Sequence, residues 1–379
     1  MITNILLTDM KHYFLLFILL LVIITIEGCT EELHPETNGT NSPVLNEGEL
    51  TKAVLDLSVN TFAVEAQAET RASIPSNIPE NETSEEKEVH NIWVFQYDAV
   101  TKELLIKPRY YTITDQIMLQ DLPVYLKAGI PSFVYVVTNT GYDNWVNDDT
   151  DTSWQKFKNL EQLKKQTLPT AFPLRSIDKV SIPMVGASEE VEVTTGITVT
   201  VPVTRMYAKL KVKVEMLKAE MKLNNVNVRQ IPNICRIETF AGDGNGEPMN
   251  AVPFPDGTTF SSIAFAASDL EKSEDKEWAV FYVPENLQGE IENQGGNKSD
   301  AAPTNALVVD VTAEIGGEKY LYAAYPGGNS LNNFNIQRNQ VYRMTLTITG
   351  EKGQNNPSSN CFVVKPNGFL SFEPYYRVE

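Results

Sequence analysis

The sequence predicts an all-β fold built from β-sandwiches. From about residue 50 onward most of the chain alternates apolar and polar residues, as in residues 53–60, where positions 53, 55, 57 and 59 are apolar. Such alternation is typical of strands that bury one face. Clusters of glycine and asparagine separate these stretches, for example at residues 139–141 and 316–317. Many short strands with such turns and long connections favour sandwiches.

The same alternation predicts further strands at residues 89–97, 133–138, 191–203, 207–216, 278–283, 307–315, 319–325 and 341–349. One segment has helical periodicity instead, because Trp154, Phe157, Leu160 and Leu163 recur every three residues. With Ser153 available as the N-cap, this segment predicts a single short helix that covers a sheet.

The first 28 residues have the pattern of a signal peptide. Residues 13–26 are apolar except for Thr25, a run too short to cross a bilayer comfortably. A start at Met10 would give the usual short basic segment ahead of this run. The run ends in Ile26-Glu27-Gly28-Cys29, which resembles the lipobox of bacterial lipoproteins, with Glu27 where a small residue is usual. We expect Cys29 to be the lipid-modified first residue of the mature chain. The alternative is ordinary secretory cleavage that leaves a free thiol.

Composition divides the rest of the chain. Residues 29–49 are rich in Asn, Thr, Pro and Glu, which predicts a flexible tether, and the acidic residues after Cys29 resemble surface-export signals of Bacteroidetes lipoproteins. We expect an N-terminal sandwich at residues 50–204, a C-terminal sandwich at residues 205–349 with the boundary near Arg205, and a tail at residues 350–379.

Several classes of function are disfavoured. The formal net charge is −18 without a stripe of Lys or Arg, which argues against nucleic-acid binding. Of three histidines only His90 falls in a predicted folded segment, so neither a catalytic triad nor a zinc site is expected. Cys235 and Cys361 could form a disulfide or remain two buried thiols. We expect no enzyme activity, no metal and no cofactor.

Acidic segments and tryptophans are the two groups of residues that could suggest a binding site. The acidic segments 143–151 and 243–247 lack the spacing of a calcium loop with its distal Glu. Trp93, Trp154 and Trp278 lie in strand or helix patterns and are predicted to be core residues, whereas Trp145 lies in an acidic loop and is the one aromatic expected to be exposed.

Four passages together resemble the fimbrillins, the two-domain pilins of Bacteroidetes. Ile182-Pro183-Met184-Val185-Gly186 resembles their Pro-Met-x-Gly segment, and residues 199–212 resemble the strand that links their two sandwiches. Residues 281–286 read F-Y-V-P-E-N, and residues 325–349 resemble the penultimate hairpin of the family. This resemblance implies two transthyretin-like β-sandwich domains in tandem and a subunit that polymerises.

The resemblance also implies roles for particular residues. In that family an Arg-specific protease cuts a loop of the N-terminal domain, the first strand leaves, and the C-terminal strand of another subunit fills the groove. Here the first strand would present Ala53, Leu55, Leu57 and Val59. The cut would fall between Arg71 and Ala72, because Arg71 is the only Lys or Arg between Lys52 and Lys87. The polar residues 73–88 would provide slack. The alternative is that Arg71 is an uncut, solvated loop residue.

The tail offers the candidate donor residues Phe362, Val364, Phe369 and Phe372. Its two apolar segments could form a donor hairpin or the last strands of the second sandwich, and residues 360–364 also resemble the opening of a further domain in longer relatives.

The sequence therefore predicts a structural subunit of a fimbria, anchored by lipid in the outer membrane and partnered by other fimbrial subunits. The alternative is a monomeric surface lipoprotein or tip adhesin that binds a glycan or a host protein.

Overall fold

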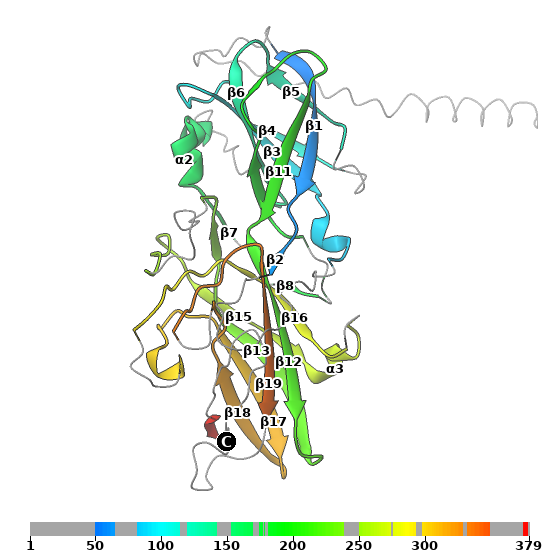
Figure 1. The fold of residues 1–379 in the computed structure, drawn as a ribbon, viewed down its shortest axis with the longest axis vertical. Coiled ribbons are helices and arrows are strands. Elements are labelled where there is room, and N and C mark those ends of the chain that lie inside the picture. Colours follow the sequence, from blue (N-terminus) through cyan, green and yellow to red (C-terminus); the bar gives the residue numbers. More distant parts are fainter. Residues whose placement is uncertain are drawn as a thin grey trace, which may run out of the picture. The chain divides into compact units, whose positions relative to one another are not determined.

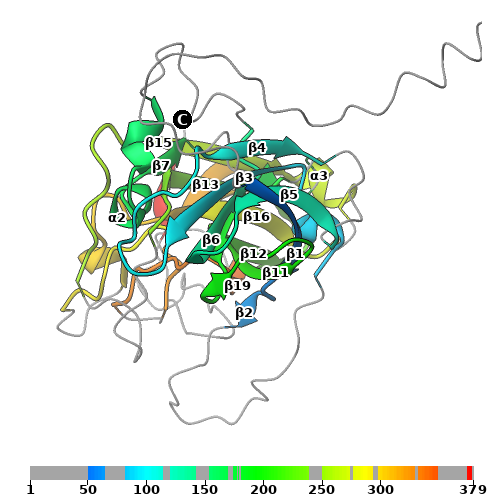
Figure 2. The ribbon, with the colours of Figure 1, turned by 90° about the horizontal axis from the view of Figure 1, so that it is seen from above.

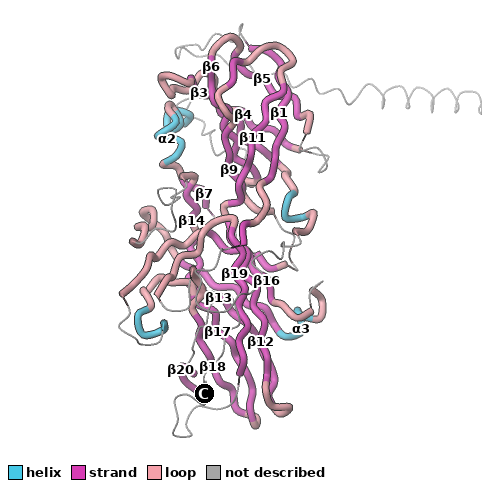
Figure 3. The backbone as a smooth tube through the Cα atoms, viewed as in Figure 1, coloured by secondary structure: helices cyan, strands magenta, loops and turns pink. Residues whose placement is uncertain are grey.

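The computed structural model describes residues 50–64, 82–113, 120–141, 153–169, 174–176, 178, 181–238, 250–273, 276–292, 298–328, 332–348 and 374–377. Within these ranges the chain is nearly all strand and loop (Figure 3). The predicted all-β fold is confirmed. No helix in this part of the chain has the length and apolar character needed to cross a membrane.

The first sheet is built entirely from residues before Tyr207. Its strands run in the order β4 (Arg109–Thr112), β3 (Asn91–Asp98), β6 (Pro131–Thr138), β9 (Met184–Ala187), β11 (Thr198–Arg205), β1 (Leu50–Val59) and β5 (Leu122–Lys127), with β10 (Val191–Glu192) paired to β6. The inward face of these strands forms one apolar core, whose members include Leu55, Val94, Val136 and Val201.

The second and third sheets pack face to face. The second contains β2 (Ala63–Val64), β19 (Gln340–Ile348), β12 (Tyr207–Met216), β16 (Ala279–Pro284) and β8 (Leu174–Arg175). The third contains β15 (Phe260–Ala266), β13 (Met221–Pro232), β17 (Val308–Ile315), β18 (Glu318–Ala324) and β20 (Pro374–Arg377). Their facing residues form a second apolar core that joins, for example, Leu210 and Phe281 to Val226 and Val311, as expected for a sandwich.

Some strands from before Arg205 pair with strands from after it. β2 and β8 lie in the second sheet, and β7 (Thr167–Pro169) pairs with β14 (Ile234–Arg236). The division into domains at residues 50–204 and 205–349 therefore stays a prediction.

The predicted helix is present in two pieces. A 3₁₀ helix covers Ser153–Phe157, and α2 (Leu160–Lys164) follows, with its N-cap at Asn159, whose side chain accepts from the Gln162 amide. Phe157, Leu160 and Leu163 pack against the outer aromatic face of β3, so the predicted covering role is correct and the Ser153 cap is not. The described part of the chain also contains α3 (Ala267–Leu270), a short α-helix that the sequence did not predict.

Most predicted strands appear within two residues of their expected ends. The prediction for residues 191–203 was wrong in extent, because the chain turns at Gly196 (φ +74°) and forms β10 and β11 separately. β13 escaped prediction because irregularities between Leu223 and Asn225 and between Arg229 and Ile231 interrupt its alternation. β5 was not predicted, because Pro123 argues against a strand in this apolar segment. A proline is tolerated there because β5 is an edge strand of the sheet.

Candidate assembly site

The first strand of the described chain is inserted between two others (Figures 1 and 2). β1 runs parallel to β11, pairing Val54–Val59 with Thr198–Val203, and antiparallel to β5, pairing Leu50–Leu55 with Lys127–Leu122. The strand predicted at Ala53–Val59 is therefore confirmed as a strand. Because β5 has no other strand neighbour among the described residues, removing β1 would leave a slot with two walls rather than one exposed edge.

Alternate side chains of β1 enter the core of the first sheet. Ala53 and Leu55 are fully buried, Leu57 is 5% exposed, and Val59 is half-buried. Full burial of one leucine contributes about 1.5–3 kcal/mol. Leu55 and Leu57 together thus contribute about 3–6 kcal/mol, a large part of the roughly 5–15 kcal/mol that stabilises a typical domain. Loss of β1 would therefore remove a large part of the stability of this core.

The outer wall of the slot has supports besides β1. Gln96, fully buried on β3, donates to the carbonyl of Lys127 (2.9 Å) and accepts from the Lys127 amide (2.7 Å). The hydroxyl of Tyr111 on β4 accepts from the amide of Tyr125 (3.2 Å). These bonds tie β5 to the other end of the same sheet, so β1 is not the only element that holds β5 in place.

Immediately after β1 the chain meets a buried group of charges. We call Glu82, Glu86, Arg205, Lys209 and Tyr282 the charged cluster. Glu86, in a short 3₁₀ helix (Glu85–Lys87), is fully buried and accepts from Lys209 Nζ (2.7 Å) and from the Tyr282 hydroxyl (2.5 Å). Arg205 is also fully buried and lies 3.4 Å from Glu82. Charges at this depth persist only when paired and hydrogen-bonded.

Residues 60–62 complete this cluster. Arg205 donates to the carbonyl of Asn60 (2.8 Å), and its guanidinium carbon lies 4.1 Å from the centre of the Phe62 ring. Asn339 bridges the same groups, since its side chain accepts from Arg205 (3.1 Å) and donates to the carbonyl of Thr61 (2.7 Å). Directly after Phe62, β2 pairs in parallel with Gln340 and Val341 of β19. The segment between β1 and residue 65 is thus fixed by hydrogen bonds, ring stacking and strand pairing.

The environment shifts the pKa values of the two central groups. Burial lowers the pKa of Arg205, and the charges of Glu82 and Glu86 partly oppose this. An arginine side chain nevertheless remains a cation in proteins. Burial alone would raise the pKa of Glu82, but hydrogen bonds from Lys87 and from the Phe62 amide, together with the charge of Arg205, bring its pKa below the usual value. Arg205 and Glu82 therefore face each other as an ion pair at neutral pH.

Much of the predicted site lies outside the described residues. These residues are Cys29, Arg71, Ala72, Phe362, Val364, Phe369 and Phe372, and their roles stay predictions. The segments on either side of Arg71 are described, and both end on the charged cluster: residues 60–64 on one side and 82–87 on the other. The idea that residues 73–88 are slack was wrong for residues 82–88, because buried charges do not register in a hydropathy pattern.

Cys235 and three of the tryptophans, for which no functional role is expected, pack into the protein. Cys235 on β14 is buried as a free thiol, and burial raises its pKa, which opposes thiolate chemistry. Trp93 is buried in β3, and Trp154 and Trp278 pack against the same outer aromatic cluster. Cys361 and Trp145 lie outside the described residues.

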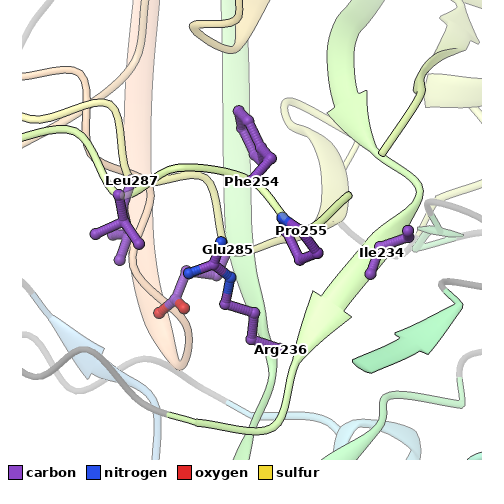
Figure 4. Close-up of a pocket in the computed structure, with 7 residues that line it drawn as sticks. Ile234, Arg236, Phe254, Pro255, Glu285 and Leu287 are labelled. Atoms are coloured by element: carbon purple, nitrogen blue, oxygen red, sulfur yellow. The ribbon is translucent and has the colours of Figure 1, made fainter. Parts of the chain in front are cut away.

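A small cavity lies elsewhere, between β14 and the loops near Phe254 and Leu287 (Figure 4). Its polar lining is Arg236 and Glu285. Both carboxylate oxygens of Glu285 accept from Arg338, at 3.1 and 2.9 Å, so the acid is already paired. Among the described residues no group of three acidic, histidine or cysteine side chains is placed to hold a metal ion.

Comparison with known proteins gives three findings. Residues 281–346 match the model of a domain of unknown function, DUF4906. The curated proteins contain no match to this chain. Among solved structures, the tip fimbrial protein Mfa3 of Porphyromonas gingivalis, with a C-terminal truncation, has a TM-score of 0.49 and 15% identity, covering 86% of this chain and 99% of that chain.

A fimbrial assembly protein of Parabacteroides distasonis has a TM-score of 0.44 and 14% identity, covering 83% of this chain and 94% of that one.

Proposed function

We propose that this protein is a structural subunit of a surface fimbria. It is exported as a lipoprotein through Cys29, cut between Arg71 and Ala72, and assembled when a strand from another subunit replaces β1. The observation that carries this proposal is the position of β1. The strand is inserted between β11 and β5, supplies three buried side chains, and precedes the segment that contains Arg71.

The physical basis is strand addition into a preformed slot. An incoming strand would regain hydrogen bonds from β11 and β5, and its alternate side chains would fill the spaces left by Ala53, Leu55 and Leu57. Gln96 and Tyr111 retain β5 as the outer wall. The free energy recovered by refilling the core drives the exchange, and the cut makes the departure of β1 possible.

Exposure of the purified mature chain to an Arg-specific protease tests this proposal. Cutting after Arg71 should yield a new N-terminus at Ala72 and then oligomers, measured by light scattering after size-exclusion chromatography. An Arg71→Gln variant is the matched control and should stay monomeric under the same protease. A subunit that loses residues 29–71 and never associates would refute strand exchange.

The lipid anchor is tested separately in cells. A Cys29→Ala variant should lose incorporation of labelled fatty acid and appear in the soluble fraction. Labelling that persists in this variant would refute the assignment of Cys29.

A further inference from the structure

The place occupied by Phe62 is a built binding site. We call Arg205, Asn339, Glu82 and the start of β19 the Phe62 seat. It holds residues 60–64 through five kinds of contact: the Asn60 and Thr61 carbonyls, the Phe62 amide and ring, and the β2 ladder. Phe62 is 5% exposed, so its surroundings cover the side chain almost completely.

A cut after Arg71 divides these contacts unequally. Residues 60–64 lie on the side that leaves, whereas Glu82, Arg205 and Asn339 stay with the subunit. Even in the uncut chain Arg205 Nη2 finds no acceptor among the described residues. After the cut, Arg205 would lose the Asn60 carbonyl and the Phe62 ring, and the seat would open to water. A segment that brings a carbonyl and an aromatic ring would restore both contacts and bury apolar surface again.

The chain contains a second segment with the same pattern. Residues 60–64 read Asn-Thr-Phe-Ala-Val, and residues 360–364 read Asn-Cys-Phe-Val-Val. Two of the identical positions make side-chain contacts: Phe62 stacks on Arg205 in the seat, and Asn60 donates to the hydroxyl of the neighbouring Thr204 (2.8 Å). Thr61, which differs, is exposed and uses only its carbonyl in the contacts above.

We propose that the Phe62 seat of a cut subunit receives residues 360–364 of a second copy of this chain, with Phe362 in the place of Phe62. This inference rests on the proposed function. One seat and one tail per copy give a head-to-tail contact, which extends into a filament where the rotation between copies does not close a ring.

The match distinguishes the seat from the slot. Residues 351–359 precede Asn360 as residues 51–59 precede Asn60, but they are mostly polar and lack the alternation of residues 53–59. A segment other than residues 351–359 therefore fills the β1 slot. Phe369 and Phe372 remain the candidates for that slot, and Phe362 and Val364 are assigned to the seat.

Peptide binding to the cut full-length chain tests the seat. The receptor carries Phe362→Ala in its own tail, so that its own residues 360–364 do not compete. The probe is a fluorescent peptide of residues 357–366 with Cys361→Ser, followed by anisotropy. We expect saturable binding to the cut receptor and none to the uncut one. A Phe362→Ala peptide should bind at least about tenfold more weakly because the buried ring is lost, and a Phe362→Leu peptide should lie between the two.

Two further measurements locate the contact. An unlabelled peptide of residues 57–66 should compete with the probe, because both contain the Asn-x-Phe-x-Val pattern. An Asn339→Gly receptor, in which glycine tolerates the left-handed backbone at this position (φ +56°), should bind the probe roughly fivefold more weakly through loss of one buried hydrogen bond.

The outcomes separate this inference from the proposed function. In one outcome, the cut protein forms oligomers while the probe peptide binds equally well with Phe362→Ala, or is not displaced by the competing peptide. This result would overturn the inference about the seat and leave strand exchange intact. In another outcome, the cut wild-type chain stays monomeric and does not bind the probe, whereas the Phe362→Ala receptor binds it. This would show that the tail folds back on its own subunit. That result would overturn the role of the second copy.

Discussion

The guanidinium of Arg205 stacks on the ring of Phe62, with 4.1 Å between the guanidinium carbon and the ring centre. Arg205 ends β11, which pairs along β1, and it also contacts Glu82 beyond the segment that contains Arg71. One side chain therefore joins the strand proposed to leave, the segment after it and the core that stays. The charged cluster therefore links the stability of the protein to residues 60–62 and 82–87.

Replacing Arg205 should destabilise the uncut protein strongly. In Arg205→Met the carboxylate of Glu82 loses its buried cation and the carbonyls of Asn60 and Glu86 lose donors. Breaking a buried ion pair from one side costs about 3–5 kcal/mol, measured as the free energy of unfolding in urea. Arg175→Met is the matched control. Its ion pairs with Asp178 and Asp269 are partly solvated, so the loss there should be within about 1 kcal/mol. Equal losses in the two variants would contradict the central role of Arg205.

The protein should lose stability in acid partly through Glu82. The folded-state pKa of Glu82 is below its usual value, so its contribution is complete above the unfolded pKa of about 4.3 and is lost as pH falls through the lower folded pKa. A Glu82→Gln variant should be less stable than wild type at pH 7 and should show a shallower fall in unfolding free energy below about pH 4.3. Glu161→Gln, at a side chain that is 65% exposed, serves as control and should follow the wild-type curve. A Glu82→Gln curve parallel to wild type would rule out this contribution.

Gln96 should govern the retention of β5. Replacing it by leucine removes both hydrogen bonds to the Lys127 backbone, each buried group costing about 1–3 kcal/mol when left unpaired. We expect faster hydrogen exchange at residues 124–127, most of all in the cut protein, where β1 no longer supports β5. Gln166→Leu is a control, because the Gln166 side chain donates to the carbonyls of Lys156 and Gln162, which lie outside β5. Unchanged exchange in β5 after cutting would show that another contact holds the wall.

Gly186 should not tolerate a side chain. A Cβ atom there would lie 1.9 Å from the carbonyl oxygen of Pro202 on β11, so the two strands would have to separate. Gly186→Ala should destabilise the protein by at least about 1–3 kcal/mol, the usual cost of overpacking. Gly129→Ala provides the contrast, because a Cβ at Gly129 meets nothing within 4 Å and only its positive φ opposes alanine, at about 1–2 kcal/mol. Both are measured by thermal and urea unfolding. A smaller loss at Gly186 than at Gly129 would be inconsistent with the close approach of β9 and β11.

The sequence by itself determined the all-β class, most strands, the buried face of β1 and the covering helix, because alternation and periodicity state which face of a segment is apolar. The glycine of the Pro-Met-x-Gly segment was also visible, although its reason, the approach of Pro202, was not. Tertiary structure alone decided that β1 lies between β11 and β5, since periodicity names a buried face but not the neighbouring strand.

The charged cluster and Gln96 were likewise decided by the fold. Glu82, Glu86 and Gln96 are polar residues that a hydropathy pattern assigns to solvent, and only the convergence of distant segments supplies the partners that make their burial possible.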